Sequence, residues 1–365
     1  MVESVRAFIL PHVTGHSGAI GSSYAQKLRC RQLDLFFKYF PLLGSSSQYS
    51  ICMPLVAWAC GDWFALRIYL GLCLTFFWAN GAKDLLRLPR PKKGIAGVAH
   101  LETGYLEEYG FPLTHSANAV IWAAALCETL NTIGFEKSLL IPFVGFAYVL
   151  LIGFSRLYLG VHSLADLLGG LQVGFMATIL TNSVLAPLAL AVMEDPDASK
   201  TYTLLVREVT VDGSCLVAAA LCGLLALYPD KRDRWTTYAD LLSIIGVAAG
   251  WMAAAGPRFR ASNLVPAGGA VVQGGDVSTE ALLVALGSCY AGLGLVRAIG
   301  SACAGALQRR YGFCKGTFKL IKSLAMGFFL GWAADGGMYH IKDASLCCSA
   351  AVQELRRWLS EFKLR

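Results

Sequence analysis

Three short polar segments in an otherwise apolar chain carry residue types suited to phosphoryl transfer. They are KDLLRLPRP at residues 83–91, PLTH at residues 112–115 and SRLYLGVHSLAD at residues 155–166. A phosphoryl group in flight spreads negative charge over its equatorial oxygens, so fixed cations beside a nucleophile and an acid stabilise it. The three segments together supply all of these groups.

The third segment offers a nucleophile with an orienting carboxylate. His162 and Asp166 are four residues apart at the start of an apolar run, so on a helix they share one face. The carboxylate can accept a hydrogen bond from imidazole Nδ1, which fixes the tautomer and leaves Nε2 free to attack. Arg156 precedes His162 by six residues, and its planar guanidinium suits bidentate binding of phosphate oxygens.

The first two segments add cations and an acid. The first segment contains Lys83 and Arg90, and the prolines on either side of Arg90 stiffen the exit from an apolar run. In the second segment, His115 follows Pro112 at an expected helix start. His115 is available to protonate a leaving alkoxide. Taken singly, a His at a span end can be interfacial filler, and Lys or Arg there usually snorkels toward headgroups. The ordered combination favours a site.

The composition predicts the elements that must position these residues. Hydrophobic residues make up 56% of the 365 and charged residues 15%, with a mean hydropathy of +0.54. Apolar runs of about 20 residues have the length that spans a bilayer. We therefore expect an all-α, polytopic integral membrane protein with about eight to ten transmembrane helices. The nine candidate spans are residues 41–60, 63–82, 115–130, 138–154, 162–193, 214–228, 238–255, 282–299 and 318–334.

The remaining stretches predict other elements. We expect a polar N-terminal segment, a break at residues 194–208, a Gly-rich loop at residues 262–278 and an amphipathic tail helix from residue 350. The tail suits a membrane surface or a plain solvated helix equally. The expected division is an N-terminal segment (1–34), a catalytic core (35–193), an accessory bundle (194–340) and a tail (341–365).

Counting crossings predicts that the three polar segments converge. The first follows the second span, the second begins the third span, and two crossings separate the second segment from the third. An even number of crossings returns the chain to the same side, so all three lie at one membrane face. Which face this is does not follow, because the site's own cations would enter a positive-inside count.

Charge and cysteine usage exclude other classes of site. The net charge of +7 comes from basic clusters that flank spans, without the basic stripe and stacking aromatics of a nucleic-acid interface. The twelve cysteines show no C-x-x-C spacing, so we expect neither a zinc site nor a redox dithiol. No metal or other cofactor is expected.

The three segments resemble the signature of the phosphatidic acid phosphatase type 2 superfamily: K-x6-R-P, P-S-x-H and S-R-x5-H-x3-D, across residues 35–193. The resemblance implies that His162 forms a phosphohistidine, Asp166 orients it, and His115 protonates the leaving group and then activates water. It also implies a helical-bundle core of that type and a set of phosphate-binding residues: Lys83, Arg90, Arg156, Ser155 and Thr114.

Within the superfamily, KDLLRLPRPK, EYGFP and THSANA are similar to the sphingosine-1-phosphate (long-chain base phosphate) phosphatases. This resemblance implies dephosphorylation of phosphorylated sphingoid bases in the endoplasmic reticulum membrane, with the lipid substrate entering from the bilayer. Glu102, Glu107 and Glu108 could receive the cationic amine of such a base, or could form a solvated loop face. The spans after residue 193 could serve a homodimer.

One position departs from the signature, because Leu113 stands where the pattern has Ser. A missing hydrogen bond to a charged group, worth about 1.5–3 kcal/mol, slows turnover by roughly tenfold to a hundredfold. Two alternatives stay open. One is another lipid substrate, such as phosphatidate, ceramide 1-phosphate or a polyprenyl diphosphate. The other is a lipid-phosphate binding or transport protein, favoured by Leu113 and by the charges of Asp240 and Asp335 in or near later spans.

Overall fold

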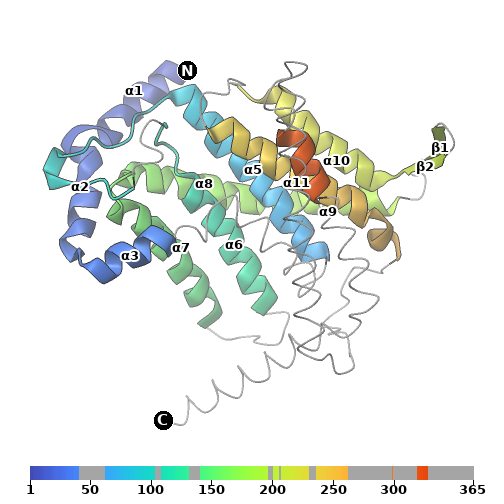
Figure 1. Cartoon of the computed structure of the whole chain (residues 1–365), viewed down its shortest axis with the longest axis horizontal. Helices are drawn as coiled ribbons and strands as arrows, with labels where there is room; N and C mark the ends of the chain where they lie inside the picture. The colour runs from blue at the N-terminus through green and yellow to red at the C-terminus, as the bar shows by residue number, and fades with distance from the viewer. Residues whose placement is uncertain are drawn as a thin grey trace, which may run out of the picture.

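The fold is a bundle of long helices with a smaller helical segment at one end (Figure 1). The computed structural model describes residues 1–40, 62–102, 108–130, 140–195, 200–204, 207–229, 236–261, 298 and 319–327. Within these described ranges, four helical stretches are long and apolar enough to cross a membrane: Trp63–Leu86, Leu140–Tyr158, Leu164–Glu194 and Thr237–Ala254. These helices make the chain a membrane protein, as the composition predicts.

The N-terminal segment is helical. It forms α1 (Val2–Val13), α2 (Gly15–Ala25), a 3-10 turn (Gln26–Leu28) and α3 (Arg31–Tyr39). Phe37 of α3 is buried, and its ring lies 5.5 Å from that of Phe154 and 4.7 Å from that of Tyr158. The segment thus packs on the helix that ends at the third polar segment.

The next helices correspond to the predicted spans of the catalytic core. They are α5 (Asp62–Leu86), α6 (Thr114–Leu130), α7 (Leu140–Tyr158), α8 (Leu164–Leu180) and α9 (Ala186–Glu194). A π-helical turn, Thr181–Leu185, joins α8 to α9 without a break, as expected for one run at residues 162–193. The loop between α5 and α6 contains a 3-10 turn, Ile95–Gly97. The predicted span at residues 41–60 lies outside the described residues.

After residue 194 the chain adds a feature that the sequence pattern did not predict. A two-stranded antiparallel hairpin, β1 (Lys200–Leu204) with β2 (Arg207–Val211), begins within the expected break and extends past its end. Two predicted spans then appear as α10 (Gly213–Leu224) with its 3-10 extension (Leu225–Leu227) and α11 (Thr236–Ala261), and residues 319–327 are helical. The span at residues 282–299, except residue 298, the Gly-rich loop and the tail lie outside the described residues.

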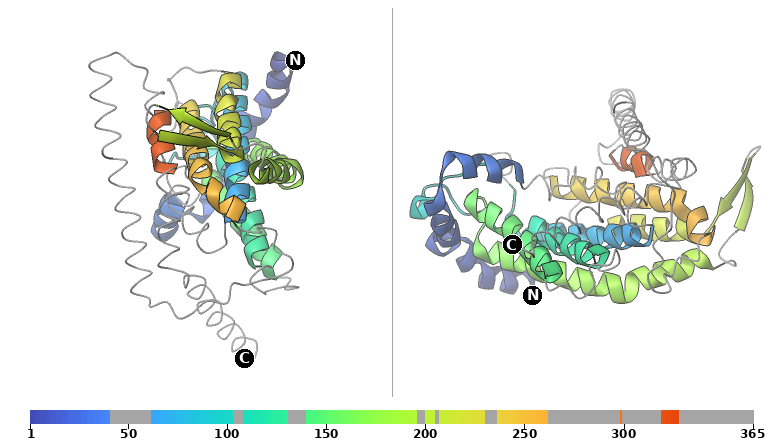
Figure 2. Two further views of the ribbon diagram at one scale, coloured as in Figure 1. Left: turned by 90° about the vertical axis from the view of Figure 1, so that its right-hand side faces the viewer. Right: turned by 90° about the horizontal axis from the view of Figure 1, so that it is seen from below.

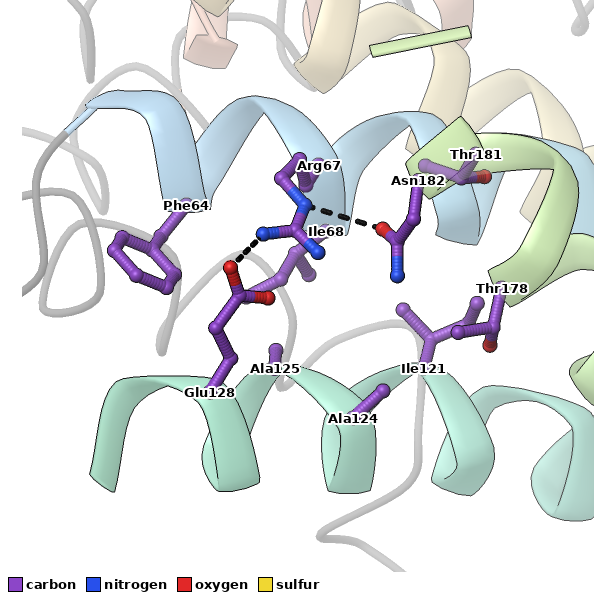
Figure 3. A pocket seen from close by; sticks show the side chains of 10 residues that line it. All are labelled: Phe64, Arg67, Ile68, Ile121, Ala124, Ala125, Glu128, Thr178, Thr181 and Asn182. Atoms are coloured by element: carbon purple, nitrogen blue, oxygen red, sulfur yellow. Dashed lines mark hydrogen bonds and ion pairs between the residues drawn. The ribbon is translucent and has the colours of Figure 1, made fainter. Parts of the chain in front are cut away.

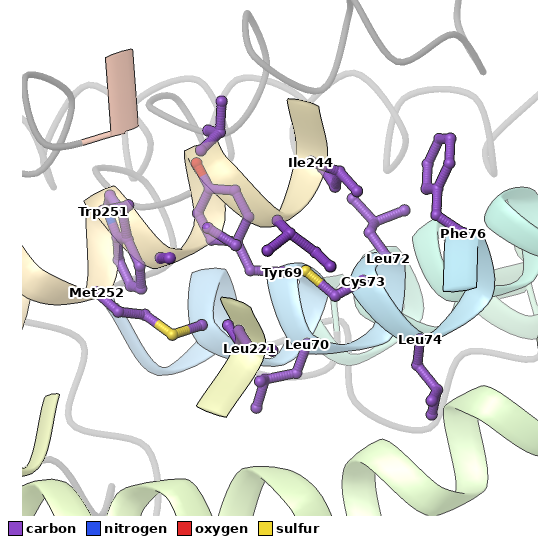
Figure 4. Packing of buried hydrophobic residues seen from close by; sticks show 14 of the residues in the cluster. Tyr69, Leu70, Leu72, Cys73, Leu74, Phe76, Leu221, Ile244, Trp251 and Met252 are labelled. Carbon is purple, nitrogen blue, oxygen red and sulfur yellow. The ribbon is translucent and has the colours of Figure 1, made fainter. Parts of the chain in front are cut away.

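Helix α5 is the centre of the bundle. In its membrane window 83% of the residues are buried, against 22% for the stretch from α8 to α9, which therefore has the larger share of its surface available to lipid. The largest hydrophobic cluster joins α5 to α9, α10 and α11, with Tyr69 and Trp251 5.2 Å apart between ring centroids (Figure 4). This hydrophobic cluster therefore holds residues from both sides of residue 194.

The helices run roughly side by side, with their ends gathered at two extremities. The N-terminal helices lie at one extremity and the hairpin at the other (Figure 2, right). The C-terminal end of α5, the start of α6, the end of α7 and the start of α8 all meet near the N-terminal helices. This is the convergence that crossing parity predicts.

Candidate active site

The third polar segment forms the turn between α7 and α8. Helix α7 carries Arg156 in its last turn, where a cation is favoured by the helix dipole. Helix α8 begins with a capping box, in which the Ser163 hydroxyl accepts from Asp166 N at 3.1 Å and Ser163 N donates to Asp166 Oδ2 at 2.7 Å. His162 therefore lies just before the helix, and not on its first turn as the i,i+4 spacing suggested.

The same carboxylate oxygen contacts the imidazole. His162 Nδ1 lies 3.3 Å from Asp166 Oδ2, and both side chains are buried, at 1% and 0% exposed. On the other edge of the ring, Arg90 Nη1 lies 2.7 Å from His162 Nε2. A guanidinium can only donate, so Nε2 accepts and the ring proton resides on Nδ1, facing Asp166. In this tautomer the Nε2 lone pair, which here accepts from Arg90, can attack phosphorus once a ligand takes the Arg90 N–H.

Three cations surround His162. Lys83, Arg90 and Arg156 are 6%, 8% and 2% exposed, and come from the end of α5, the loop after it and the end of α7. Arg156 Nε is buried and has no hydrogen-bond partner among the described residues. Unpaired guanidinium donors in a buried pocket are suited to an anionic ligand such as phosphate.

Outside the membrane-spanning helices, burial and charge lower the pKa of Arg90 and of His162. Desolvation, followed by the charge of Arg156, lowers the pKa of Arg90 to about 10. Desolvation and the cations Arg90, Arg156 and Lys83 lower the pKa of His162 well below its usual value. The imidazole is therefore neutral near pH 7, as a nitrogen nucleophile must be.

Two of the three predicted glutamates pair with the arginines. Glu102 Oε2 lies 2.8 Å from Arg156 Nη1, an ion pair whose N–H groups are not aligned for a hydrogen bond. Glu108 Oε2 lies 3.6 Å from Arg90 Nη2, and its backbone carbonyl accepts from Arg90 Nε at 3.1 Å. Glu107 lies outside the described residues. The carboxylates thus lie directly beside the cations that a phosphate would contact.

The start of α6 places His115 in the same cluster. His115 is within electrostatic range of Arg156, Lys83, Arg90 and His162. The first N–H groups of a helix have no intrahelical acceptor, so α6 also directs backbone donors toward this end. The N–H of Leu113 is an exception, because it donates to the Asp166 carbonyl at 2.9 Å.

The hydroxyls assigned to phosphate binding have partners within the protein. Thr114 Oγ1 donates to Asn80 Oδ1 at 2.8 Å, and Ser155 Oγ donates to the Ile152 carbonyl at 2.6 Å. In this conformation neither hydroxyl hydrogen is directed to a ligand. Leu113, at the signature's serine position, is fully buried in the core.

Sequence patterns missed a polar network behind Lys83. Asp84 is 6% exposed and accepts hydrogen bonds from Tyr228 and from Thr237 Oγ1, the latter at 3.1 Å. Asn80 Nδ2 donates to the Thr237 carbonyl at 2.9 Å. Asp84 was visible in the first polar segment, but its partners are more than 140 residues away. This network fixes α11 and the turn after α10 to the end of α5 that carries Lys83.

A second polar cluster lies at the other end of α5, around Arg67 (Figure 3). Arg67 pairs with Glu128 of α6 and donates to Asn182 Oδ1 of the π-helical turn at 3.1 Å. These residues line a shallow pocket with an otherwise mainly apolar wall. Arg67 precedes Lys83 by 16 residues, about 24 Å along a helix. The pocket is therefore separate from the candidate active site.

The donor set at the site does not resemble a metal centre. Among the described ranges, no group of three or more His, Cys, Asp or Glu is placed to hold a metal ion. The charged groups around His162 are instead mainly cationic. Such a set suits an anionic substrate.

Comparisons with known proteins agree with this geometry. Residues 64–188 match the model of the PAP2 superfamily. The chain is 34% identical to dihydrosphingosine 1-phosphate phosphatase YSR3 of Saccharomyces cerevisiae over 45% of this chain and 42% of that protein. It is 31% identical to lipid phosphate phosphatase delta of Arabidopsis thaliana, over 41% of this chain and 38% of that protein. It is 29% identical to human sphingosine-1-phosphate phosphatase 2, over 45% of this chain and 41% of that protein.

The matched region has clear limits. The chain spans less than half the length of each of these three relatives. The family match nevertheless contains every cation, both histidines and the carboxylate of the cluster around His162. Residues 64–188 therefore match the PAP2 superfamily, and the candidate active site lies within the matched region.

Proposed function

We propose that the protein is a lipid phosphate phosphatase that removes the phosphate from phosphorylated sphingoid bases, such as sphingosine 1-phosphate and dihydrosphingosine 1-phosphate. The observation that carries the proposal is the arrangement of His162. Its Nδ1 faces Asp166, its Nε2 contacts Arg90, and Lys83 and Arg156 lie within electrostatic range of the ring. The names of the matched relatives support this substrate class.

The proposed reaction has two steps and needs no metal. The substrate phosphate takes the N–H of Arg90 that now contacts His162 Nε2, and Nε2 attacks phosphorus as the P–O bond to the lipid breaks. His115, which enters this step as the imidazolium, gives its proton to the leaving alkoxide and becomes neutral. In the second step His115 takes a proton from water, the resulting hydroxide attacks phosphorus, and the P–N bond to His162 breaks to release phosphate. The three cations stabilise the charge on the equatorial oxygens in both steps.

The paired glutamates support a substrate that carries an amine. In a sphingoid base phosphate the ammonium is on the carbon next to the one that bears the phosphate. Glu102 lies 2.8 Å and Glu108 3.6 Å from the guanidiniums that would hold that phosphate. A carboxylate displaced from its arginine by the phosphate would be within reach of the ammonium. Glu107 remains part of this proposal as a neighbour in sequence.

The experiment is phosphate release from sphingosine 1-phosphate by the purified full chain in detergent with EDTA. Wild type should turn over, and His162→Ala should lose activity while keeping its melting temperature. Glu102→Gln should lower the preference for sphingosine 1-phosphate over phosphatidate. If wild type binds lipid phosphates but hydrolyses none of them, the proposed phosphatase activity is refuted, and the binding or transport alternative is favoured. We further propose residence in the endoplasmic reticulum membrane, testable by imaging the tagged protein.

A further inference from the structure

The N-terminal helix α2 and the turn after it contact the backbone that carries the nucleophile. We propose that Ser22 and Gln26 are positioning residues of the active site: they hold the loop before α8 and the loop before Glu102 in one geometry. The inference rests on the proposed function, and it makes the N-terminal segment a working part of the site. The signature residues all lie beyond residue 82, so the sequence pattern assigns no role to this segment.

The Gln26 side chain joins two loops that are distant in sequence. Its Nε2 donates to the carbonyl of Ala99 at 2.6 Å and to that of Tyr158 at 2.9 Å. Its Oε1 accepts from the N–H of Ala99 at 2.9 Å. Both ends of the amide are therefore used, and they join the α5–α6 loop to the end of α7. A direct bond from Leu101 N to the Leu159 carbonyl, 3.0 Å, continues the same junction.

The two loops joined by Gln26 carry the two partners of an ion pair at the site. Glu102 follows Ala99 by three residues, and Arg156 precedes Tyr158 by two. Their charges are 2.8 Å apart. A shift of either loop would move the phosphate-binding guanidinium relative to Glu102. Gln26 thus acts on the reaction through Arg156 and does not need to contact the substrate.

Ser22 acts on the nucleophile itself. Its hydroxyl is fully buried and donates to the carbonyl of His162 at 3.1 Å. Arg90 Nη1 donates to the neighbouring carbonyl of Val161 at 3.1 Å. The peptide groups before and after His162 are therefore both held by hydrogen bonds, while Asp166 orients the ring. An imidazole held at its backbone and at Nδ1 keeps Nε2 at one place relative to the bound phosphorus.

The close approach depends on a glycine. Gly160 has φ of +75°, a region that other residues rarely adopt. A Cβ at this position would lie 2.3 Å from the Ala99 carbonyl oxygen and 2.8 Å from Gln26 Nε2. The turn before His162 thus has the shape that lets Gln26 and the α5–α6 loop contact it. Two residues before Gly160, the Tyr158 hydroxyl donates a hydrogen bond to Asp34 Oδ1 of α3 at 2.7 Å, which attaches the N-terminal segment to α7 a second time.

The test compares Gln26→Ala and Ser22→Ala with two matched controls in the full chain, Gln32→Ala and Ser17→Ala, whose side chains are exposed. We expect Gln26→Ala and Ser22→Ala to lower kcat by roughly tenfold to a hundredfold with little change in KM, because misplacement of reacting groups by about 1 Å costs that much. The controls should match wild type. Hydrogen exchange at the Ala99 and Leu101 amides should become faster in Gln26→Ala and stay at the wild-type rate in Gln32→Ala.

Three results would overturn the inference. One is wild-type kcat in Gln26→Ala and Ser22→Ala. Another is a loss of kcat that is fully accounted for by a loss of folded protein, measured from the melting temperature. The third is unchanged exchange at Ala99 and Leu101, which decides the matter even if wild type hydrolyses no lipid phosphate. In that last case the proposed function fails, and faster exchange in Gln26→Ala would still support the junction of the two loops.

Discussion

The most informative substitution is at Asp166, because one oxygen of this carboxylate both caps helix α8 and contacts the imidazole of His162. Oδ2 accepts from Ser163 N at 2.7 Å and faces His162 Nδ1 at 3.3 Å, whereas Oδ1 is buried without a hydrogen-bond partner among the described residues. The single carbonyl oxygen of an asparagine could replace Oδ2 in both contacts, with its amide group in the place of Oδ1. Asp166→Asn should therefore keep the helix cap and the tautomer, and lose only the negative charge.

The magnitudes follow from that difference. A hydrogen bond to a charged acceptor is stronger than one to a neutral acceptor by about 1–2 kcal/mol. Asp166→Asn should therefore lower kcat by roughly fivefold to thirtyfold. Asp166→Ala removes both acceptors, which leaves buried donors unpaired at about 1–3 kcal/mol each. It should lower the melting temperature and reduce kcat by roughly three to four orders of magnitude, as when an imidazole loses its tautomer.

The assay is single-turnover phosphate release from sphingosine 1-phosphate, with the melting temperature recorded on the same preparations. Asp195→Asn, at the exposed end of α9, is the control for removal of one acidic charge. An Asp166→Asn variant as inactive and as unstable as Asp166→Ala would refute the reasoning. That result would mean that the charge of the carboxylate, and not the position of Oδ2, organises both the cap and the imidazole.

Three further predictions follow from other parts of the molecule. Leu113→Ser should destabilise the fold by about 2–5 kcal/mol, since the leucine is fully buried; turnover per folded molecule, compared with wild type, then shows whether a hydroxyl here assists phosphate binding. Because the folded state lowers the pKa of His162, the unfolded chain binds more protons below about pH 6.5, and stability falls as pH decreases. The melting temperature of wild type should therefore fall more between pH 7.5 and 5.5 than that of His162→Gln; equal falls would contradict the pKa shift. Arg67→Met should lower stability by about 1 kcal/mol or less, because Glu128 is 38% exposed, and should leave kcat unchanged; a large loss of activity would contradict the separation of the two ends of α5.

Much of the candidate site could be predicted from the sequence. The cations, histidines and carboxylate are short-range patterns, since each segment keeps its residues at a spacing set by one helix end. Crossing parity then predicts that the segments meet, because long apolar runs must traverse the bilayer. The pairing of His162 with Asp166 was also predicted, although the helix begins at Leu164 and the contact is made through the capping box.

The contacts between segments were decided by the tertiary structure. Gln26 reaches Ala99 and Tyr158 over 73 and 132 residues, and Asp84 reaches Tyr228 and Thr237 over 144 and 153. No helical or strand periodicity relates residues so far apart, because these hydrogen bonds depend on where whole helices pack. The sequence by itself therefore determined which groups could do the chemistry and that they meet at one face of the membrane. Packing of the N-terminal helices and of α10 and α11 around α5 decided how those groups are held.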